Sequence, residues 1–323
     1  MILQGPCDAA RSRLSVDDGA RPEDASAWPS ISVVIPTFGR PRELHACLDA
    51  MAKLDYPRER YEIVVVDDGS DPPVGPSADA AASGLRMHWL RQENAGPAAA
   101  RNAGARVATG EILAFTDDDC KPASDWLSAI VAALAREPRG LCGGTTTNAL
   151  ERNAFSEASH AIVDVALEHL HAGVDDLRFF PSNNLALRAD GFAAIGGFDA
   201  SFRTAEDRDL CDRWLRAGRP LVPAPAATVE HRHVLSLASF WRQHFGYGRG
   251  AYRLHRARSR RGAPQFVPDF ACYAKVFRRP VAAKRPGAAV AAVALMCVWQ
   301  IANVSGFLWQ GAVGEHQRTP PRA

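Results

Sequence analysis

The sequence lacks the patterns that mark disulfide-bonded, zinc-binding and secreted proteins. Its seven cysteines are scattered from Cys7 to Cys297, and no two of them have the C-x-x-C spacing of a zinc site or a redox motif. The first residues, MILQGPCDAARSR, lack the charged-then-apolar order of a signal peptide. This cysteine usage fits a reducing compartment. We therefore predict that the folded part of the chain lies in the cytoplasm.

Acidic residues are almost missing from one long segment. From Arg232 to Arg285 the chain carries thirteen Lys or Arg residues and a single acid, Asp269, although the net charge of the whole chain is only +2. Such a block suits an anionic surface, either phospholipid headgroups or nucleic acid, and the alternative is a solvated basic face. The overall hydrophobic content of 47% and charged content of 23% are those of a globular protein with a buried core.

Charge of either sign is absent between Gly287 and Gly314, a segment long enough to cross a bilayer. Its hydrophobicity is moderate because it is rich in Ala and contains Gln and Asn, and it has tryptophans at 299 and 309 that suit membrane interfaces. Basic residues precede it, which by the positive-inside rule keeps the preceding domain cytoplasmic. We predict one spanning helix, with an in-plane helix or a buried helix of the domain or of an oligomer as alternatives.

Short apolar runs bounded by polar residues predict a parallel α/β sheet in the first half of the chain. The predicted strands are Ile31–Ile35, Ile63–Val66, Met87–Leu90 and Ile112–Phe115. Helical patterns lie between them, including Pro97–Val107, which has Pro in its first turn. Strand, helix and strand in alternation favour right-handed parallel connections.

The rest of the chain is predicted to be more mixed. The predicted helices are Asp125–Ala135, Ala154–Leu170 and Glu206–Ala217, and the predicted strands are Leu141–Thr147 and Asn183–Arg188. The predicted organisation is a flexible leader at 1–29, an enzyme domain at 30–230, a basic helical extension at 231–286, the apolar helix at 287–314 and a tail at 315–323.

Polar residues collect where three predicted strands end, at Pro36-Thr37, Asp67-Asp68 and Asp117-Asp118-Asp119. In open parallel sheets, ligands bind beyond the carboxyl ends of the strands. Strand alternation would send Asp117 and Asp119 to one side, where their oxygens suit Mg²⁺ or Mn²⁺. The alternative is a solvated acidic turn in which an Asp caps the next helix.

Three segments, ISVVIPTFGR, EIVVVDDGS and NAGPAAARNAGARVATGEILAFTDDDCKP, resemble glycosyltransferase family 2 in order and spacing over residues 31–122, and later motifs extend the resemblance to about residue 250. The resemblance implies a GT-A fold, a Rossmann-like and mostly parallel sheet flanked by helices. It also implies that Asp117 and Asp119 hold a divalent cation, Mg²⁺ or Mn²⁺, against the donor's diphosphate. The nucleotide-sugar site that we expect comprises Pro36, Thr37, Arg40, Asp67, Asp68, Asn94, Gly96, Arg101, Asn102 and Asp118.

The resemblance assigns the general base to Asp207, with Glu206 supporting it. A structural reading competes, because Thr204-x-x-Asp207 also fits a capping box at a helix start. His231, after a predicted strand, occupies the place of a family histidine that completes the metal or diphosphate site, and His233 is a rival.

The activity implied is an inverting transfer of one sugar from a nucleotide-diphospho-sugar, UDP-type first, to an acceptor hydroxyl. The segment around Tyr247-Gly248-Arg249-Gly250 resembles a lid of non-processive members and lacks the full Q-x-x-R-W pattern of processive synthases. The acceptor class stays open between a lipid carrier, a glycan and a small molecule; a membrane surface is expected as a partner and nucleic acid is not. A nucleotidyltransferase and a silent nucleotide-sugar-binding protein are the alternatives. Gly246-x-Gly248-x-Gly250 follows a helical pattern, which makes it a poor dinucleotide loop.

Overall fold

The computed structural model describes residues 28–76, 84–172, 178–263, 272, 274–278 and 286–313. Most of the predicted leader, residues 1–27, and the predicted tail at 315–323 lie outside the described residues. In chain order the elements are β1 (Ile31–Thr37), α1 (Pro41–Met51), η2 (Arg58–Arg60), β2 (Tyr61–Asp67), β3 (Met87–Arg91), α3 (Pro97–Val107), β4 (Ile112–Thr116), β5 (Cys120–Pro122), α4 (Trp126–Arg136), β6 (Leu141–Asn148), α5 (Ala154–Ala172), β7 (Asn184–Arg188), α6 (Ala189–Ala194), α7 (Glu206–Arg216), β8 (Leu221–His231), α8 (Leu237–Arg260) and α10 (Pro286–Val313).

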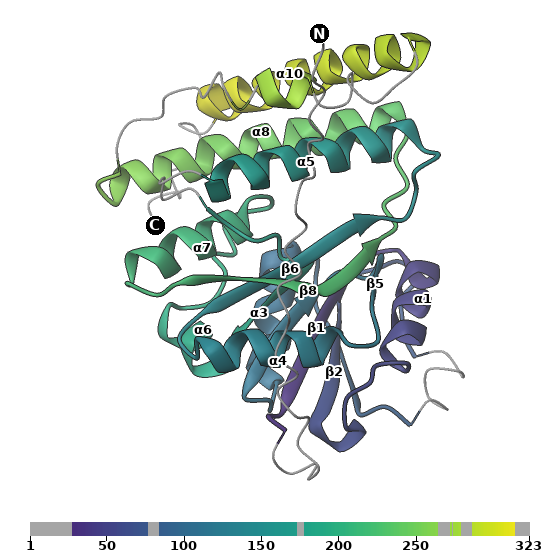
Figure 1. Cartoon of the computed structure of the whole chain (residues 1–323), viewed down its shortest axis with the longest axis vertical. Helices are drawn as coiled ribbons and strands as arrows, with labels where there is room; N and C mark the ends of the chain where they lie inside the picture. Colours follow the sequence, from purple (N-terminus) through teal and green to yellow (C-terminus); the bar gives the residue numbers. More distant parts are fainter. Residues whose placement is uncertain are drawn as a thin grey trace, which may run out of the picture.

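One eight-stranded sheet organises the molecule, with the order β3-β2-β1-β4-β7-β6-β8-β5 (Figure 1). The parallel pairing predicted for the first four strands is confirmed, because β3, β2, β1 and β4 all run in one direction. The other half is mixed: β7 is antiparallel to both β4 and β6, β6 and β8 are parallel, and β5 is antiparallel to β8. The fold is therefore α/β with a mixed sheet.

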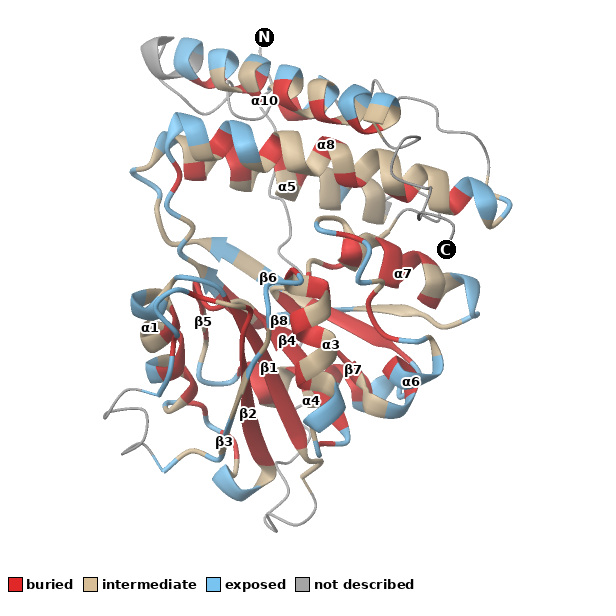
Figure 2. Cartoon of the chain, turned by 180° about the vertical axis from the view of Figure 1, so that it is seen from behind, coloured by how far each residue is buried: buried red, intermediate tan, exposed pale blue. Residues whose placement is uncertain are grey.

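Helices cover both faces of this sheet, which explains why its central strands are apolar without alternation. Every residue of β1, β2 and β4 is buried, as the red strands of Figure 2 show. Val33 and Ile35 point into the core beside α1 and α4, whereas Val34 points into the core beside α3, α6 and α7. The continuous apolar runs in the sequence thus correspond to strands buried on both sides.

A layer of long helices, α5, α8 and α10, lies beyond one edge of the sheet (Figure 1). Their buried side chains form a separate apolar cluster that includes Ile162, Phe240 and Met296. At the contact between α8 and α10 the two backbones touch: a Cβ atom at Gly248 would overlap the Asn303 carbonyl. Gly248 therefore serves helix packing, which agrees with the exclusion of this segment as a dinucleotide loop.

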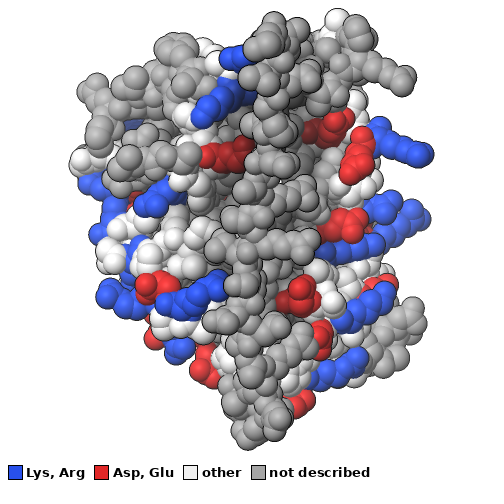
Figure 3. All heavy atoms as spheres, in the orientation of Figure 1, with Lys and Arg blue, Asp and Glu red and all other residues white. Residues whose placement is uncertain are grey.

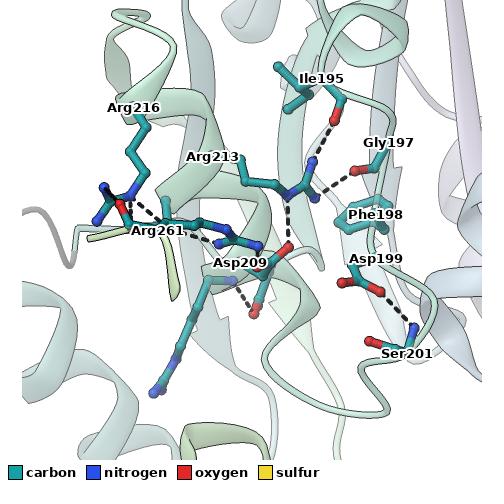
Figure 4. A network of polar contacts seen from close by, with 12 residues as sticks. Ile195, Gly197, Phe198, Asp199, Ser201, Asp209, Arg213, Arg216 and Arg261 are labelled. Atoms are coloured by element: carbon teal, nitrogen blue, oxygen red, sulfur yellow. Dashed lines mark hydrogen bonds and ion pairs between the residues drawn. The ribbon is translucent and has the colours of Figure 1, made fainter. Parts of the chain in front are cut away.

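The basic segment does not form a single solvated face. Arg258 and Arg261, at the end of α8, form ion pairs with Asp212 of α7, and Arg261 also pairs with Asp209. Figure 4 shows the Asp209 part of this network, where Arg213 also donates to the carbonyls of Ile195 and Gly197. On the face seen in Figure 3, side chains of both charges are interspersed. Part of the basic run therefore fastens α7 to α8.

Candidate active site

The parallel strands bring their polar ends to one edge of the sheet. β1 ends at Thr37, β2 at Asp67 and β4 at Thr116, and these strands are neighbours in the order β2-β1-β4. The Thr37 hydroxyl donates to the Asp118 carboxylate at 2.7 Å, which joins the end of β1 to the turn after β4. Asp68 accepts hydrogen bonds from the backbone N–H groups of Ala95 and Gly96 at 2.9 and 2.8 Å. This carboxylate therefore holds the loop that leads into α3.

A cavity of about 540 Å³ opens at this edge. It is lined by the ends of β1 and β8, the turn after β4, the starts of α3 and α7, and one residue each of α5 and α8. The predicted site residues that line it are Pro36, Thr37, Arg40, Asp68, Asn94, Gly96, Arg101, Asp117, Glu206, Asp207 and His231. Segments far apart in the sequence thus meet around one space of the size of a small-ligand site.

The other four predicted residues do not line this cavity. Asp67 accepts from the backbone of Ser70 and Val74, and Asn102 exchanges two hydrogen bonds with the backbone of Phe198. Asp118 and Asp119 are buried beneath Arg40, which pairs with both of them at 2.5 Å. Their predicted roles in binding stay predictions.

The three consecutive acids do not follow strand alternation. β4 ends at Thr116, and Asp117–Asp119 form a turn closed by a hydrogen bond from the Cys120 N–H to the Asp117 carbonyl at 3.1 Å. Asp117 faces Arg101, whereas Asp119 faces Arg40 and His231. The strand geometry behind the expectation for Asp117 and Asp119 therefore does not apply, because a turn sets each side chain separately.

Arg101 joins the acidic turn to the start of α7. Its side chain is only 3% exposed, and its guanidinium donates to Asp117 at 2.6 Å and to Glu206 at 2.8 Å. Although burial opposes its charge, the two carboxylates raise the pKa of Arg101. The guanidinium therefore stays charged and fixes the distance between the two acidic motifs.

The start of α7 does not form the capping box that competed with the base assignment. Ala205 occupies the N-cap position in the left-handed region, with φ 68°, where Ala costs about 1–2 kcal/mol relative to the right-handed form. The Thr204 hydroxyl donates to the Gly246 carbonyl of α8 at 2.8 Å instead of capping α7. The Asp207 carboxylate accepts from the Ser182 N–H at 3.3 Å and lies in the cavity wall. The capping alternative for Thr204-x-x-Asp207 is therefore excluded.

Burial raises the pKa of several carboxyl groups at this site. Desolvation and the neighbouring Asp207 raise the pKa of Glu206 to about 7, against the pull of Arg101. Desolvation also raises the pKa of Asp207, and it raises the pKa of Asp118 to about 7 although Arg40 opposes it. Carboxyl groups with raised pKa values in a cleft are suited to proton transfer near neutral pH.

One group of side chains in the described part of the chain has ligand spacing for a metal. Ligand atoms of Asp119, Cys120 and His231 lie within 4.8 Å of one another, and His231 Nε2 is 3.3 Å from an Asp119 oxygen. Although burial opposes ionisation, the hydrogen bond and charge of His231 hold the pKa of Asp119 well below its usual range. Burial raises the pKa of the Cys120 thiol. A thiolate is also a soft ligand, whereas Mg²⁺ and Mn²⁺ prefer oxygen ligands.

A carboxylate and an imidazole therefore fit a divalent cation that keeps open positions for phosphate oxygens. Between the two rival histidines, His231 lines the cavity and contacts Asp119, whereas His233 belongs to neither arrangement. Asp117 is not in this group, and its predicted role as a ligand stays a prediction.

Several lining residues were not predicted from the sequence. Arg203 donates to the Asn94 side chain at 3.0 Å and lies over Gly96, where a Cβ atom would be 2.9 Å from its Cδ. Phe179 stacks beneath Arg208, whose guanidinium carbon is 4.6 Å from the ring centre. No local motif marks Arg203 or Phe179. The only signal in the sequence is the predicted strand Asn183–Arg188, which places the residues just before it near the sheet. Of the predicted lid, Tyr247 lines the cavity.

Comparison with known proteins agrees with this architecture. A relative from Mycobacterium tuberculosis, "Pre-mycofactocin glycosyltransferase", is 29% identical over 239 residues, which cover 72% of this chain and 48% of the relative. "Validoxylamine A glucosyltransferase" of Streptomyces hygroscopicus is 28% identical over 254 residues, which cover 67% of this chain and 60% of that protein. The chain thus spans about half the length of the first of the curated relatives that it matches.

Among solved structures, the mannosyltransferase PcManGT from Pyrobaculum calidifontis, in complex with GDP-Man and Mn²⁺, matches with a TM-score of 0.61. The match covers 92% of this chain and 90% of that one at 19% identity, and it shows a shared fold, which confirms the GT-A expectation. The family described as "Glycosyl transferase family 2" matches residues 32–203, just over half of the chain. The strand ends and the acidic turn lie within the matched residues, and this protein belongs to glycosyl transferase family 2.

Proposed function

We propose that the protein is an inverting glycosyltransferase that moves one sugar from a nucleotide-diphospho-sugar to an acceptor hydroxyl. Asp207 is the general base, and a divalent cation, Mg²⁺ or Mn²⁺, assists the departure of the nucleoside diphosphate. A UDP-sugar is the first donor to test, with a GDP-sugar second because the mannosyltransferase of similar fold was solved with GDP-Man.

The observation that carries this proposal is the Arg101 bridge. This buried guanidinium contacts Asp117 and Glu206 together, so the acidic turn and the base motif border the same cavity. A transferase needs this proximity, because the departing diphosphate and the attacking hydroxyl sit on opposite sides of one sugar carbon. A protein that only bound nucleotides would not need the Asp207 carboxylate in the wall of this cavity.

When bound, the cation would supply positive charge to the diphosphate oxygens as the glycosidic bond breaks. Asp119 and His231 are the residues that would hold it. Arg40 adds a fixed positive charge beside them and reaches the cavity. These groups favour the charge that develops on the leaving oxygens.

Asp207 takes the proton of the acceptor hydroxyl. One of its oxygens accepts from the Ser182 N–H, which orients the carboxylate toward the cavity. Its raised pKa makes the carboxylate a stronger proton acceptor than an exposed Asp. A single displacement with one base and no covalent intermediate inverts the anomeric carbon. The acceptor itself stays open between a lipid carrier, a glycan and a small molecule.

We also infer that this domain works on the cytoplasmic side of a membrane, with α10 as the element that meets the lipid. The six cysteines that the structure describes are all free thiols, which supports a reducing compartment. The apolar composition of Val290–Val313, with a mean hydropathy of 1.7 over an 18-residue window, supports the membrane contact.

Thermal unfolding with donors and metal tests the proposal. The wild-type chain should gain stability with a UDP-sugar or GDP-sugar plus Mn²⁺, by about 2.7 kcal/mol at 100 times the dissociation constant. Asp119→Ala should lose the metal-dependent part, and Asp49→Ala, which removes an exposed acid on α1, should retain it. Equal stabilisation of Asp119→Ala and wild type would refute the metal assignment.

Donor hydrolysis separates the remaining alternatives. Asp207→Asn should still be stabilised by donor and metal but should release sugar far more slowly than wild type. Release of pyrophosphate from a nucleoside triphosphate would instead indicate a nucleotidyltransferase. If no nucleotide-sugar is hydrolysed under any condition that stabilises the fold, the protein is a binding module.

A further inference from the structure

The outward face of α10 is apolar along its whole described length. Ile301 is 57% exposed and Leu308 is 64% exposed. The other exposed positions described on this helix are Val290, Ala291, Val293, Ala294, Cys297, Val304, Trp309 and Ala312. None of these side chains is charged, and Trp309 alone carries a nitrogen. Soluble domains rarely expose a continuous apolar surface of this length unless another apolar phase covers it.

The polar side chains of the same helix point toward the protein. Gln310 is 6% exposed and accepts a hydrogen bond from Arg249 of α8 at 3.0 Å. The Asn303 amide donates to the His244 carbonyl at 3.5 Å, and the Gln300 side-chain oxygen is buried. A helix on a water-soluble domain has the opposite arrangement, with its apolar stripe inward. Polar side chains turned inward and aliphatic side chains turned outward are typical of helices in contact with lipid.

The packing between α10 and α8 is close. Gly306 of α10 lies against the Phe245 carbonyl, and Gly248 of α8 lies against the Asn303 carbonyl, with no room for a Cβ atom at either place. These small residues let the two helix backbones touch. This contact also fixes the direction of α10 relative to the rest of the molecule.

α10 lies lengthwise along α8, as the outermost layer of the molecule (Figure 1). The contacts advance in the same direction along both helices, from Phe245 with Gly306 to Tyr252 with Gly311. α8 carries six arginines and no acid. If α10 crossed a bilayer in this arrangement, α8 would enter the hydrocarbon beside it, and each arginine there would cost several kcal/mol.

We propose that α10 binds flat on a lipid bilayer with anionic headgroups. Its outward face from Val290 to Leu308 enters the boundary between headgroups and acyl chains, and the basic, acid-free α8 lies behind it near the headgroup charge. This assigns the in-plane alternative to the apolar segment. It rests on the membrane contact of α10 proposed above and does not depend on the proposed sugar transfer.

A second copy of this chain suits the face less well. Protein interfaces carry about one hydrogen bond per 100–200 Å² and have a polar rim. The outward face of α10 offers neither, because its polar residues are directed inward to α8. A fluid acyl phase requires no such partners.

Vesicle binding of the full chain tests the proposal with a matched pair of variants. Val304 on the outward face and Val107 at the end of α3 are exposed to almost the same extent, 43% and 40%. Val304→Glu should bind vesicles of equimolar phosphatidylcholine and phosphatidylglycerol about tenfold more weakly than wild type. Val107→Glu adds the same charge elsewhere and should bind like wild type. Equal binding by the two variants, or no binding by wild type, overturns the proposal.

Depth measurements decide the orientation. Nitroxide labels on Cys297 and on cysteines introduced at Val290, Ile301 and Leu308 sample the outward face over roughly 27 Å of helix, at 1.5 Å per residue. A flat helix places all four labels at the same shallow depth. A gradient with the deepest label near the middle means a spanning helix and overturns the proposal. A second result would also overturn the proposal. In it, light scattering shows that the wild-type chain is a dimer, Val304→Glu dissociates the dimer, and the wild-type chain does not bind vesicles.

Discussion

Two glycines of α8 provide a sharp test of how the candidate base is positioned. Gly246 and Gly250 both face Thr204, the residue two before Glu206. A Cβ atom at Gly250 would overlap the Thr204 hydroxyl and lie 2.7 Å from its carbonyl oxygen, whereas one at Gly246 would lie 3.6 Å from the Thr204 methyl group. Gly250→Ala and Gly246→Ala therefore make the same chemical change on the same helix, but only the first displaces the turn before α7.

The magnitudes follow from two opposing effects. Each Gly→Ala change gains about 1 kcal/mol of helix propensity. Overpacking against backbone costs about 1–3 kcal/mol and applies to Gly250→Ala alone. The free energies of unfolding of the two variants should thus differ by about 1–3 kcal/mol, with Gly246→Ala the more stable. Because Ala205 already holds a left-handed conformation, a shifted Thr204 should move Asp207 and lower kcat by about 10- to 100-fold in Gly250→Ala.

Urea unfolding gives the stability of both variants, and donor turnover gives kcat and KM separately. A positioning effect lowers kcat and leaves donor affinity almost unchanged, because the proposed base acts on the acceptor hydroxyl and not on the donor. If both variants have the same stability and the same kcat, the close contact between α8 and Thr204 does not position the base, and that argument is refuted.

Three further predictions concern α7 and the side chains that contact it. The proposed base works deprotonated, and burial raises the pKa of Asp207. Sugar transfer should therefore be lost as the pH falls through a value above the ordinary pKa range of Asp. Initial rates measured against pH check this, and a profile without a loss of rate at acidic pH contradicts it. Arg101→Met leaves Asp117 and Glu206 without their buried cation. Urea unfolding should show that this lowers the free energy of unfolding by about 3 kcal/mol. An unchanged free energy of unfolding would mean that the bridge is dispensable. Asp209→Asn weakens two arginine contacts at the α7–α8 junction and should cost about 2 kcal/mol in the same assay, unless the network of Figure 4 is redundant.

Local patterns predicted elements well where one rule dominated. The helix Pro97–Val107 has the predicted bounds, because Pro starts it and apolar spacing continues it. The apolar runs at β1, β2 and β4 predicted buried parallel strands, since nothing but two covering layers explains a strand without alternation. The direction of β7 was not predictable, because the residues of a buried strand look the same whichever way it runs.

The site shows the same division. The acids after β4 identified the edge, but strand alternation does not set their orientation, because the strand ends where the turn begins at Asp117. Thr204 looked like a helix cap and instead bonds α8, a partner 42 residues away. No local pattern could find Arg203, which reaches the cavity through contacts with the distant Asn94.

By itself, the sequence determined the family, the parallel half of the sheet, the edge that bears the candidate site and the apolar character of the last helix, because each depends on short-range spacing or composition. Tertiary structure alone decided that Arg101 joins two acidic motifs, that His231 contacts Asp119 and that α10 turns its aliphatic face outward. These features depend on contacts between segments that are distant in the sequence. Packing and charge pairing across the whole fold determine those contacts, so they cannot be predicted from a window of neighbouring residues.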